Sequence, residues 1–200
     1  MSVVNVDYRL APQYTFPTRI EDGYDAFKWI ATNATEIRAD PCKGFIVGGV
    51  SAGANFTGVI AYLARDDAIS APITGLFLSI PCCLMPQACN VVPQWKGELL
   101  SMEQNKDSDM LDVRSYHQLI EDIYEALLSD PRILFLLYPD HSGLLKRAYF
   151  QICGLDPIRD EAFLFDPLLR KISGASTRVD IYDGLPHGFW RFQEMPAAKK

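Results

Sequence analysis

The chain has 200 residues, of which 48% are hydrophobic and 22% charged, a composition typical of one folded domain with a sizeable core. Its net charge of −6 offers no basic surface for nucleic acid, and no apolar run reaches the roughly 18 residues that span a bilayer. The first residues carry no export signal, so we expect a cytoplasmic protein without stable membrane insertion.

Five short segments rich in β-branched or aromatic residues are predicted to be strands, each bounded by Gly, Pro or Asp. They cover residues 3–6, 44–47, 73–80, 147–153 and 177–182. Apolar residues at helical spacing predict one helix over 20–31 and a second that opens at Ser51 or Ala52 and ends near 65–67. Strands that alternate with helices predict an α/β fold with a mostly parallel sheet.

The pattern changes between Cys82 and about Leu137. A loop with Pro and Cys residues leads into a charged stretch in which apolar residues return at helical spacing, namely Leu119, Ile123, Ala126 and Leu127. No repeat or Gly/Ser linker marks a second domain. We therefore expect a single domain, 1–200, with a helical cap inserted at about 84–137.

The chain has five cysteines, an odd number: Cys42, Cys82, Cys83, Cys89 and Cys153. They form no C-x-x-C pair, and no His stands at metal-ligand spacing. We expect buried reduced thiols, with neither a disulfide framework nor a metal site.

A G-x-S-x-G pentapeptide at 49–53 lies between the strand at 44–47 and the second helix. A serine on such a sharp strand-to-helix turn is held in a strained backbone and lifted above the sheet, and small neighbours such as Gly49 and Gly53 permit this. The following helix directs its free N–H groups to the same place, so we expect the Ala52 N–H to bind a developing oxyanion. The alternatives are an inert glycine-rich turn or a phosphate-binding loop, but no Lys follows and G-x-G-x-x-G is absent.

A serine nucleophile needs an imidazole to accept its proton. His117 lies in the charged cap stretch and His141 in a loop, whereas His187 follows the last predicted strand. Residues that follow the carboxyl ends of strands collect at the site of an α/β protein, so we predict His187 as the base.

The carboxylate that orients the histidine is predicted to be Asp156, which follows the strand at 147–153 and precedes Pro157. Asp160 is the second candidate, although the segment 159–161 is typical of the solvated start of a helix. Asp183 is better explained as a turn residue before Gly184. The order Ser51, Asp156, His187 is that of α/β-hydrolases.

Four segments together resemble the hormone-sensitive-lipase-like family of α/β-hydrolases. They are V-V-N-V-D-Y-R-L-A-P at 3–12, G-V-S-A-G-A-N at 49–55, G-L-D-P-I-R-D-E at 154–161 and P-H-G-F at 186–189. The resemblance implies a carboxylesterase that cleaves short-chain acyl esters with Ser51, Asp156 and His187 as catalytic residues, and with no metal and no cofactor.

The chain departs from the family pattern in two ways. Family members usually have Asp where Val50 stands and Gly where Ala54 stands. They also carry upstream strands and an H-G-G-G oxyanion loop, so we expect a chain that lacks the first strands. This predicts self-association through the exposed strand at 3–6. It also leaves a second hypothesis open, a catalytically impaired fragment or a non-catalytic ligand-binding protein on the same scaffold.

Overall fold

The sheet has four parallel strands that stand side by side in chain order. The computed structural model describes residues 1–90 and 92–199. The strands are β1 (Ile46–Val50), β2 (Gly75–Ser79), β3 (Arg147–Cys153) and β4 (Ser176–Tyr182), paired in the order β1-β2-β3-β4. Because all four run in the same direction, the segments that follow them meet at one edge of the sheet.

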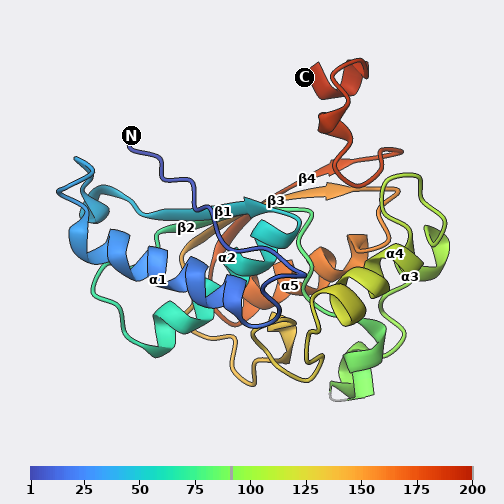
Figure 1. Cartoon of the computed structure of the whole chain (residues 1–200), viewed down its shortest axis with the longest axis horizontal. Coiled ribbons are helices and arrows are strands. Elements are labelled where there is room, and N and C mark those ends of the chain that lie inside the picture. Colours follow the sequence, from blue (N-terminus) through green and yellow to red (C-terminus); the bar gives the residue numbers. More distant parts are fainter. Residues whose placement is uncertain (91, 200) are drawn as a thin grey trace.

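Three longer helices cover one face of this sheet. They are α1 (Thr18–Asn33), α2 (Ala52–Asp66) and α5 (Arg159–Lys171), and the short helices α3 (Ser101–Gln104) and α4 (Val113–His117) lie beyond the carboxyl edge. Figure 1 shows all five on the same side of the strands. On the opposite face Ile46 is 67% exposed and Val50 44% exposed. No helix in the described ranges is both long and apolar enough to cross a membrane.

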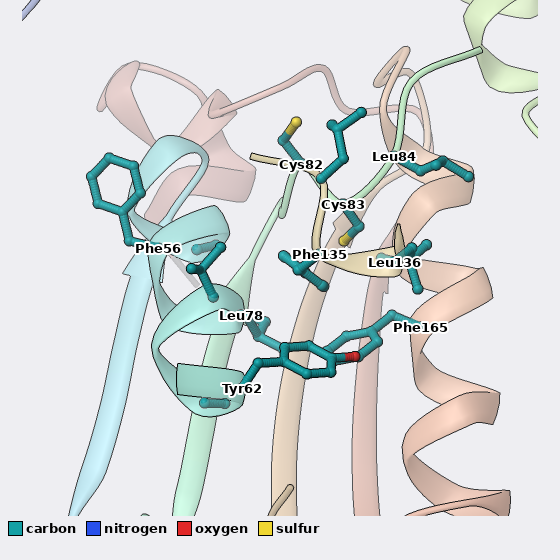
Figure 2. Packing of buried hydrophobic residues seen from close by; sticks show 14 of the residues in the cluster. Phe56, Tyr62, Leu78, Cys82, Cys83, Leu84, Phe135, Leu136 and Phe165 are labelled. Atoms are coloured by element: carbon teal, nitrogen blue, oxygen red, sulfur yellow. The ribbon is translucent and has the colours of Figure 1, made fainter. Parts of the chain in front are cut away.

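The core lies between the covered face of the sheet and the helices. Leu78 of β2 and Phe150 of β3 are fully buried, as is Phe165 of α5, whose ring makes an edge contact with Phe135 at 4.8 Å between centroids. Figure 2 shows Phe135 and Phe165 between α2 and α5, next to Tyr62. Full burial of each such side chain contributes about 1.5–3 kcal/mol, so this layer holds both helices onto the strands.

The predicted α/β fold with a parallel sheet is confirmed, and the element boundaries shift by a few residues. The strand at 147–153 is confirmed at both ends, and the strand predicted at 177–182 starts one residue earlier. The strand predicted at 44–47 continues to Val50, so it ends directly before Ser51. The first helix is longer than 20–31 by two residues at each end.

The strand predicted over 3–6 is wrong. This segment has no regular secondary structure, and Val3 is 78% exposed. A strand needs a neighbour to satisfy its backbone groups, and within the described ranges the sheet ends at β1 with no strand beyond it. Self-association through residues 3–6 stays a prediction, but it does not start from a preformed strand.

The apolar pattern that predicted a helix in the cap stretch does not mark its buried side. The residues that are buried here are Tyr116, Ile120 and Tyr124, while Leu119 is 45% exposed and Ile123 36% exposed. The three buried residues recur at every fourth position, on one face of the turns that include the π-helical turn at Gln118–Ile123, and the predicted apolar residues lie beside that face. The cap at about 84–137 as an insertion in one domain stays a prediction.

The five cysteines are all free thiols, but they differ in burial. Cys82, Cys83, Cys89 and Cys153 are buried as expected, and burial raises their pKa values. The expectation is wrong for Cys42, which is exposed because it lies in a short surface turn at Pro41–Lys43.

Candidate active site

Ser51 is the single residue between β1 and α2, and its backbone is strained. Its φ of 55° and ψ of −114° lie in a region that side-chain-bearing residues rarely adopt. The Ser51 N–H donates to the Ser79 carbonyl of β2 at 2.8 Å, and the Asn55 N–H of α2 donates to the Ser51 carbonyl at 3.0 Å. Both backbone groups of the strained residue are therefore bonded to regular elements, which hold it in place.

The two glycines of the pentapeptide have different structural roles. A Cβ on Gly49 would lie 2.2 Å from the carbonyl carbon of Gly53 and 2.3 Å from its oxygen. The backbone of α2 thus passes too close to β1 for any side chain at position 49. A Cβ on Gly53 would meet nothing within 4 Å, so the expectation that position 53 also needs a small residue is wrong.

Ser51, His187 and Asp156 form one hydrogen-bonded row. The Ser51 Oγ lies 2.9 Å from His187 Nε2, and His187 Nδ1 lies 2.7 Å from Asp156 Oδ2. A carboxylate only accepts, so Nδ1 carries the hydrogen and donates a hydrogen bond to Asp156. In the neutral imidazole Nε2 is then free to accept a hydrogen bond from the Ser51 hydroxyl. A general base requires this arrangement.

Asp156 is fully buried in the turn between β3 and α5. Its second carboxylate oxygen accepts a hydrogen bond from the Ile158 N–H at 3.0 Å. The Asn105 side chain donates to the Asp156 carbonyl at 3.0 Å and so fixes the backbone of the turn. Each oxygen of the buried carboxylate therefore has a partner, and the side chain can present only one of them to His187.

The loop that carries His187 is bonded to the turn that carries Asp156. The Gly154 N–H donates to the Tyr182 carbonyl, and the Leu155 N–H donates to the Leu185 carbonyl, both at 3.0 Å. Beyond the histidine, Phe189 is buried against Ile80 and Cys153. These contacts hold the loop so that the imidazole lies between Ser51 and Asp156.

The competing acidic residues have other surroundings. Asp160 accepts from the Ser101 N–H at 2.7 Å and from Arg159 Nε at 2.8 Å. Its segment is not a solvated helix start, because Glu161 beside it is fully buried. Asp183 is exposed in the turn after β4. Neither carboxylate bonds the imidazole of His187.

The other two histidines lie apart from the row. His117 contacts the Gln87 side-chain amide at 3.1 Å. His141 Nδ1 lies 2.6 Å from the Tyr62 hydroxyl, and burial lowers the pKa of this histidine. The structure thus brings only His187 to Ser51.

The first N–H of α2, that of Ala52, is the one expected to bind a developing oxyanion. Ala52 is the first residue of the helix, so its N–H has no acceptor within the helix. The positive end of the helix dipole lies at the same place and favours negative charge there. Among the described residues no group of three or more His, Cys, Asp or Glu is placed to hold a metal ion.

Sequence reasoning missed two buried polar residues that support this region. Glu161 accepts from two backbone N–H groups of the loop after β2, and Asn55 donates to two carbonyls. One signal was available for Asn55, because Asn is a poor helix former and yet it stands inside the predicted second helix. Glu161 gave no such signal, because acidic residues are ordinary in a first helical turn.

Comparisons with known proteins agree with the fold. A family model described as the alpha/beta hydrolase fold matches residues 1–191. An AB hydrolase superfamily protein of Schizosaccharomyces pombe is 34% identical over 197 residues, which are 98% of this chain and 57% of that protein. A versiconal hemiacetal acetate esterase of Dothistroma septosporum is 30% identical, over 98% of this chain and 59% of the esterase. The chain thus spans less than two thirds of the length of these relatives.

A solved structure extends the similarity to three dimensions. The crystal structure of vibralactone cyclase superposes with a TM-score of 0.89 at 36% sequence identity. The match covers 96% of this chain and 56% of the cyclase.

Gly49→Ala tests the close approach of α2 to β1. The new methyl group would overlap the Gly53 carbonyl, so the turn must open, at a cost of at least about 2 kcal/mol in the free energy of unfolding. Gly53→Ala is the matched control, because its methyl group has free space and Ala favours a helix by about 1 kcal/mol. Urea unfolding of both variants measures the difference. Equal losses of unfolding free energy in the two variants would contradict the close approach of α2 to β1 at Gly49.

His141→Asn tests the buried histidine. Because burial holds the pKa of His141 below its usual 6.5 in the folded state, the unfolded chain binds the proton first as pH falls. The free energy of unfolding should therefore decrease below about pH 6.5, by at most about 1.4 kcal/mol per pH unit from this group. Asn can keep a hydrogen bond to Tyr62 without titrating. The free energy of unfolding of the variant should therefore decrease less below about pH 6.5 than that of the wild type. If urea unfolding gave the same pH dependence for His141→Asn and the wild type, the buried-histidine explanation would be contradicted.

Proposed function

The chain belongs to the α/β-hydrolase family, and we propose that it hydrolyses carboxylic esters through an acyl-enzyme formed on Ser51. The observation that carries the proposal is the hydrogen-bonded row of Ser51, His187 and Asp156. The esterase name of the Dothistroma relative supports the same reaction class. The resemblance to hormone-sensitive-lipase-like enzymes supports small, short-chain acyl esters as the substrates.

The geometry supports the following reaction. The Ser51 oxygen attacks the ester carbonyl carbon while its proton passes to His187 Nε2, and the carbonyl oxygen becomes negative beside the Ala52 N–H. When the tetrahedral intermediate collapses, the C–O bond to the alcohol breaks and the alcohol takes the proton from His187. Water then attacks the acyl-enzyme, again giving its proton to His187, and the acid leaves as the Ser51 hydroxyl is restored.

Asp156 stabilises the positive charge that His187 gains in each half of the reaction. Its buried carboxylate also holds the tautomer in which Nε2 faces Ser51. Exclusion from water strengthens the attraction between the carboxylate and the imidazolium. We propose no cofactor and no metal for these steps, and a cytoplasmic location stays a prediction from the sequence.

The test uses the 200-residue chain and a fluorophosphonate probe at neutral pH. The probe should label the wild type, and the mass of the labelled peptide should place it on Ser51. Ser51→Ala should abolish both labelling and the hydrolysis of a short-chain aryl ester, and His187→Gln should slow both by at least about a thousand-fold. Circular dichroism checks that each variant is folded.

Asp156→Asn separates the carboxylate candidates. An amide at this position can hold the wrong histidine tautomer, and in serine proteases the same change in the triad lowers kcat about 10⁴-fold. Asp183→Asn is the matched control, because Asp183 is exposed and lies closer in sequence to His187. Asp160→Asn should also retain most of the activity. A larger loss in either of these variants than in Asp156→Asn would show that the acid is misassigned.

A folded wild type that neither reacts with the probe nor hydrolyses esters would overturn the proposal. That outcome would favour the second hypothesis, an impaired or ligand-binding protein on the same scaffold.

A further inference from the structure

We propose that Glu161 is a positioning residue, which sets the geometry of the site by fastening the loop Cys82–Leu84 to the helix that follows Asp156. The proposal rests on the ester-hydrolase function proposed above. Glu161 does not touch the reacting atoms, and it acts through the backbone on both sides of them.

Glu161 lies in the first turn of α5 and is fully buried. Its Oε2 atom accepts hydrogen bonds from two successive backbone N–H groups, those of Cys83 and Leu84, the second at 2.8 Å. The other carboxylate oxygen, Oε1, is buried and has no hydrogen-bond partner among the described residues. Burial of a carboxyl group with one unsatisfied oxygen costs stability. The two hydrogen bonds from the loop to the other oxygen offset part of this cost.

Asn55 holds the same loop from the opposite side. It lies one turn after Ser51 on α2, is 1% exposed, and donates to the Cys82 carbonyl at 2.8 Å and to the Ile133 carbonyl at 2.7 Å. Figure 2 shows Cys82, Cys83 and Leu84 between the ribbons of α2 and α5. The loop therefore connects the helix of the nucleophile with the helix that follows the acid.

The loop is also continuous with the strand that fixes Ser51. β2 ends at Ser79, whose carbonyl accepts from the Ser51 N–H at 2.8 Å. The next residue, Ile80, donates its N–H to the Gln151 carbonyl of β3 at 2.8 Å, and the loop follows at once. Ser51 is thus tied through β2 and this loop to Glu161, which lies in the first turn of the helix that follows Asp156.

This connection does not pass through the imidazole of His187. The row from Ser51 to Asp156 needs two hydrogen bonds to be correct at once, so the two ends must keep a fixed separation. A misplacement of about 1 Å can cost a hundred-fold in rate. The contacts of Glu161 and Asn55 with the loop Cys82–Leu84 form a second link between Ser51 and Asp156. Loss of this link should therefore affect the chemical step more than substrate binding.

The test compares Glu161→Gln with Glu161→Met. Gln keeps the volume and one oxygen that can accept from both N–H groups, whereas Met keeps only the volume. Burial raises the pKa of Glu161 and so favours the neutral carboxyl form, which the amide of Gln resembles. We expect Glu161→Gln to keep kcat for a short-chain aryl ester within a few-fold of the wild type. Glu161→Met should lower kcat and the rate of fluorophosphonate labelling about a hundred-fold, with KM within about two-fold.

Leu169→Ala is the control for a purely structural effect. Leu169 is also fully buried on α5, but it lies more than two turns beyond Glu161. Its truncation should lower the melting temperature at least as much as Glu161→Met, while leaving kcat near the wild-type value at a temperature where both are folded. Equal kcat losses in the two variants, or a loss in Glu161→Gln as large as in Glu161→Met, would overturn the positioning role.

The ring signals of His187 in NMR separate this proposal from the proposed function. If the wild type is folded but inactive, the esterase function fails, and the positioning role is then judged on these signals alone. They should shift in Glu161→Met and stay in place in Leu169→Ala. Unchanged His187 signals in Glu161→Met would overturn the positioning role whether or not the chain is active.

Discussion

The strained backbone of Ser51 is the constraint on which the rest of the site depends. A residue with a side chain at positive φ costs about 1–3 kcal/mol and persists only when its surroundings hold it. Here β2 holds its N–H through Ser79, and α2 holds its carbonyl through Asn55. Gly49 leaves the space that lets α2 turn back so closely over β1. The result is a hydroxyl fixed at the carboxyl edge of the sheet, directly after β1.

The parallel sheet brings the partners of this hydroxyl to the same edge. His187 lies 136 residues after Ser51 and 31 residues after Asp156. β3 and β4 end level with each other, with Cys153 paired to Tyr182, so the segments that follow them start side by side. Backbone hydrogen bonds between these segments then hold the acid and the base at hydrogen-bond distance. Strand register therefore sets the geometry that the chemistry needs.

Sequence reasoning singled out Ser51, Asp156 and His187 because each follows closely after a segment whose β-branched or aromatic residues mark a strand. It failed where burial depends on distant parts of the chain. The local sequence around Glu161 is typical of a solvated helix start, and the burial of this residue comes from a loop 78 residues away. The segment 3–6 has strand-forming residues, but a strand also needs a partner, which local sequence does not reveal.

A crystal structure of the chain after reaction with an aryl phosphonate ester tests the central claim most directly. We expect a covalent bond from phosphorus to Ser51 Oγ, with one phosphonyl oxygen within hydrogen-bond distance of the Ala52 N–H and His187 still bonded to Asp156. Phosphorus attached to another residue, or attached to Ser51 with His187 more than about 4 Å from its oxygen, would contradict it.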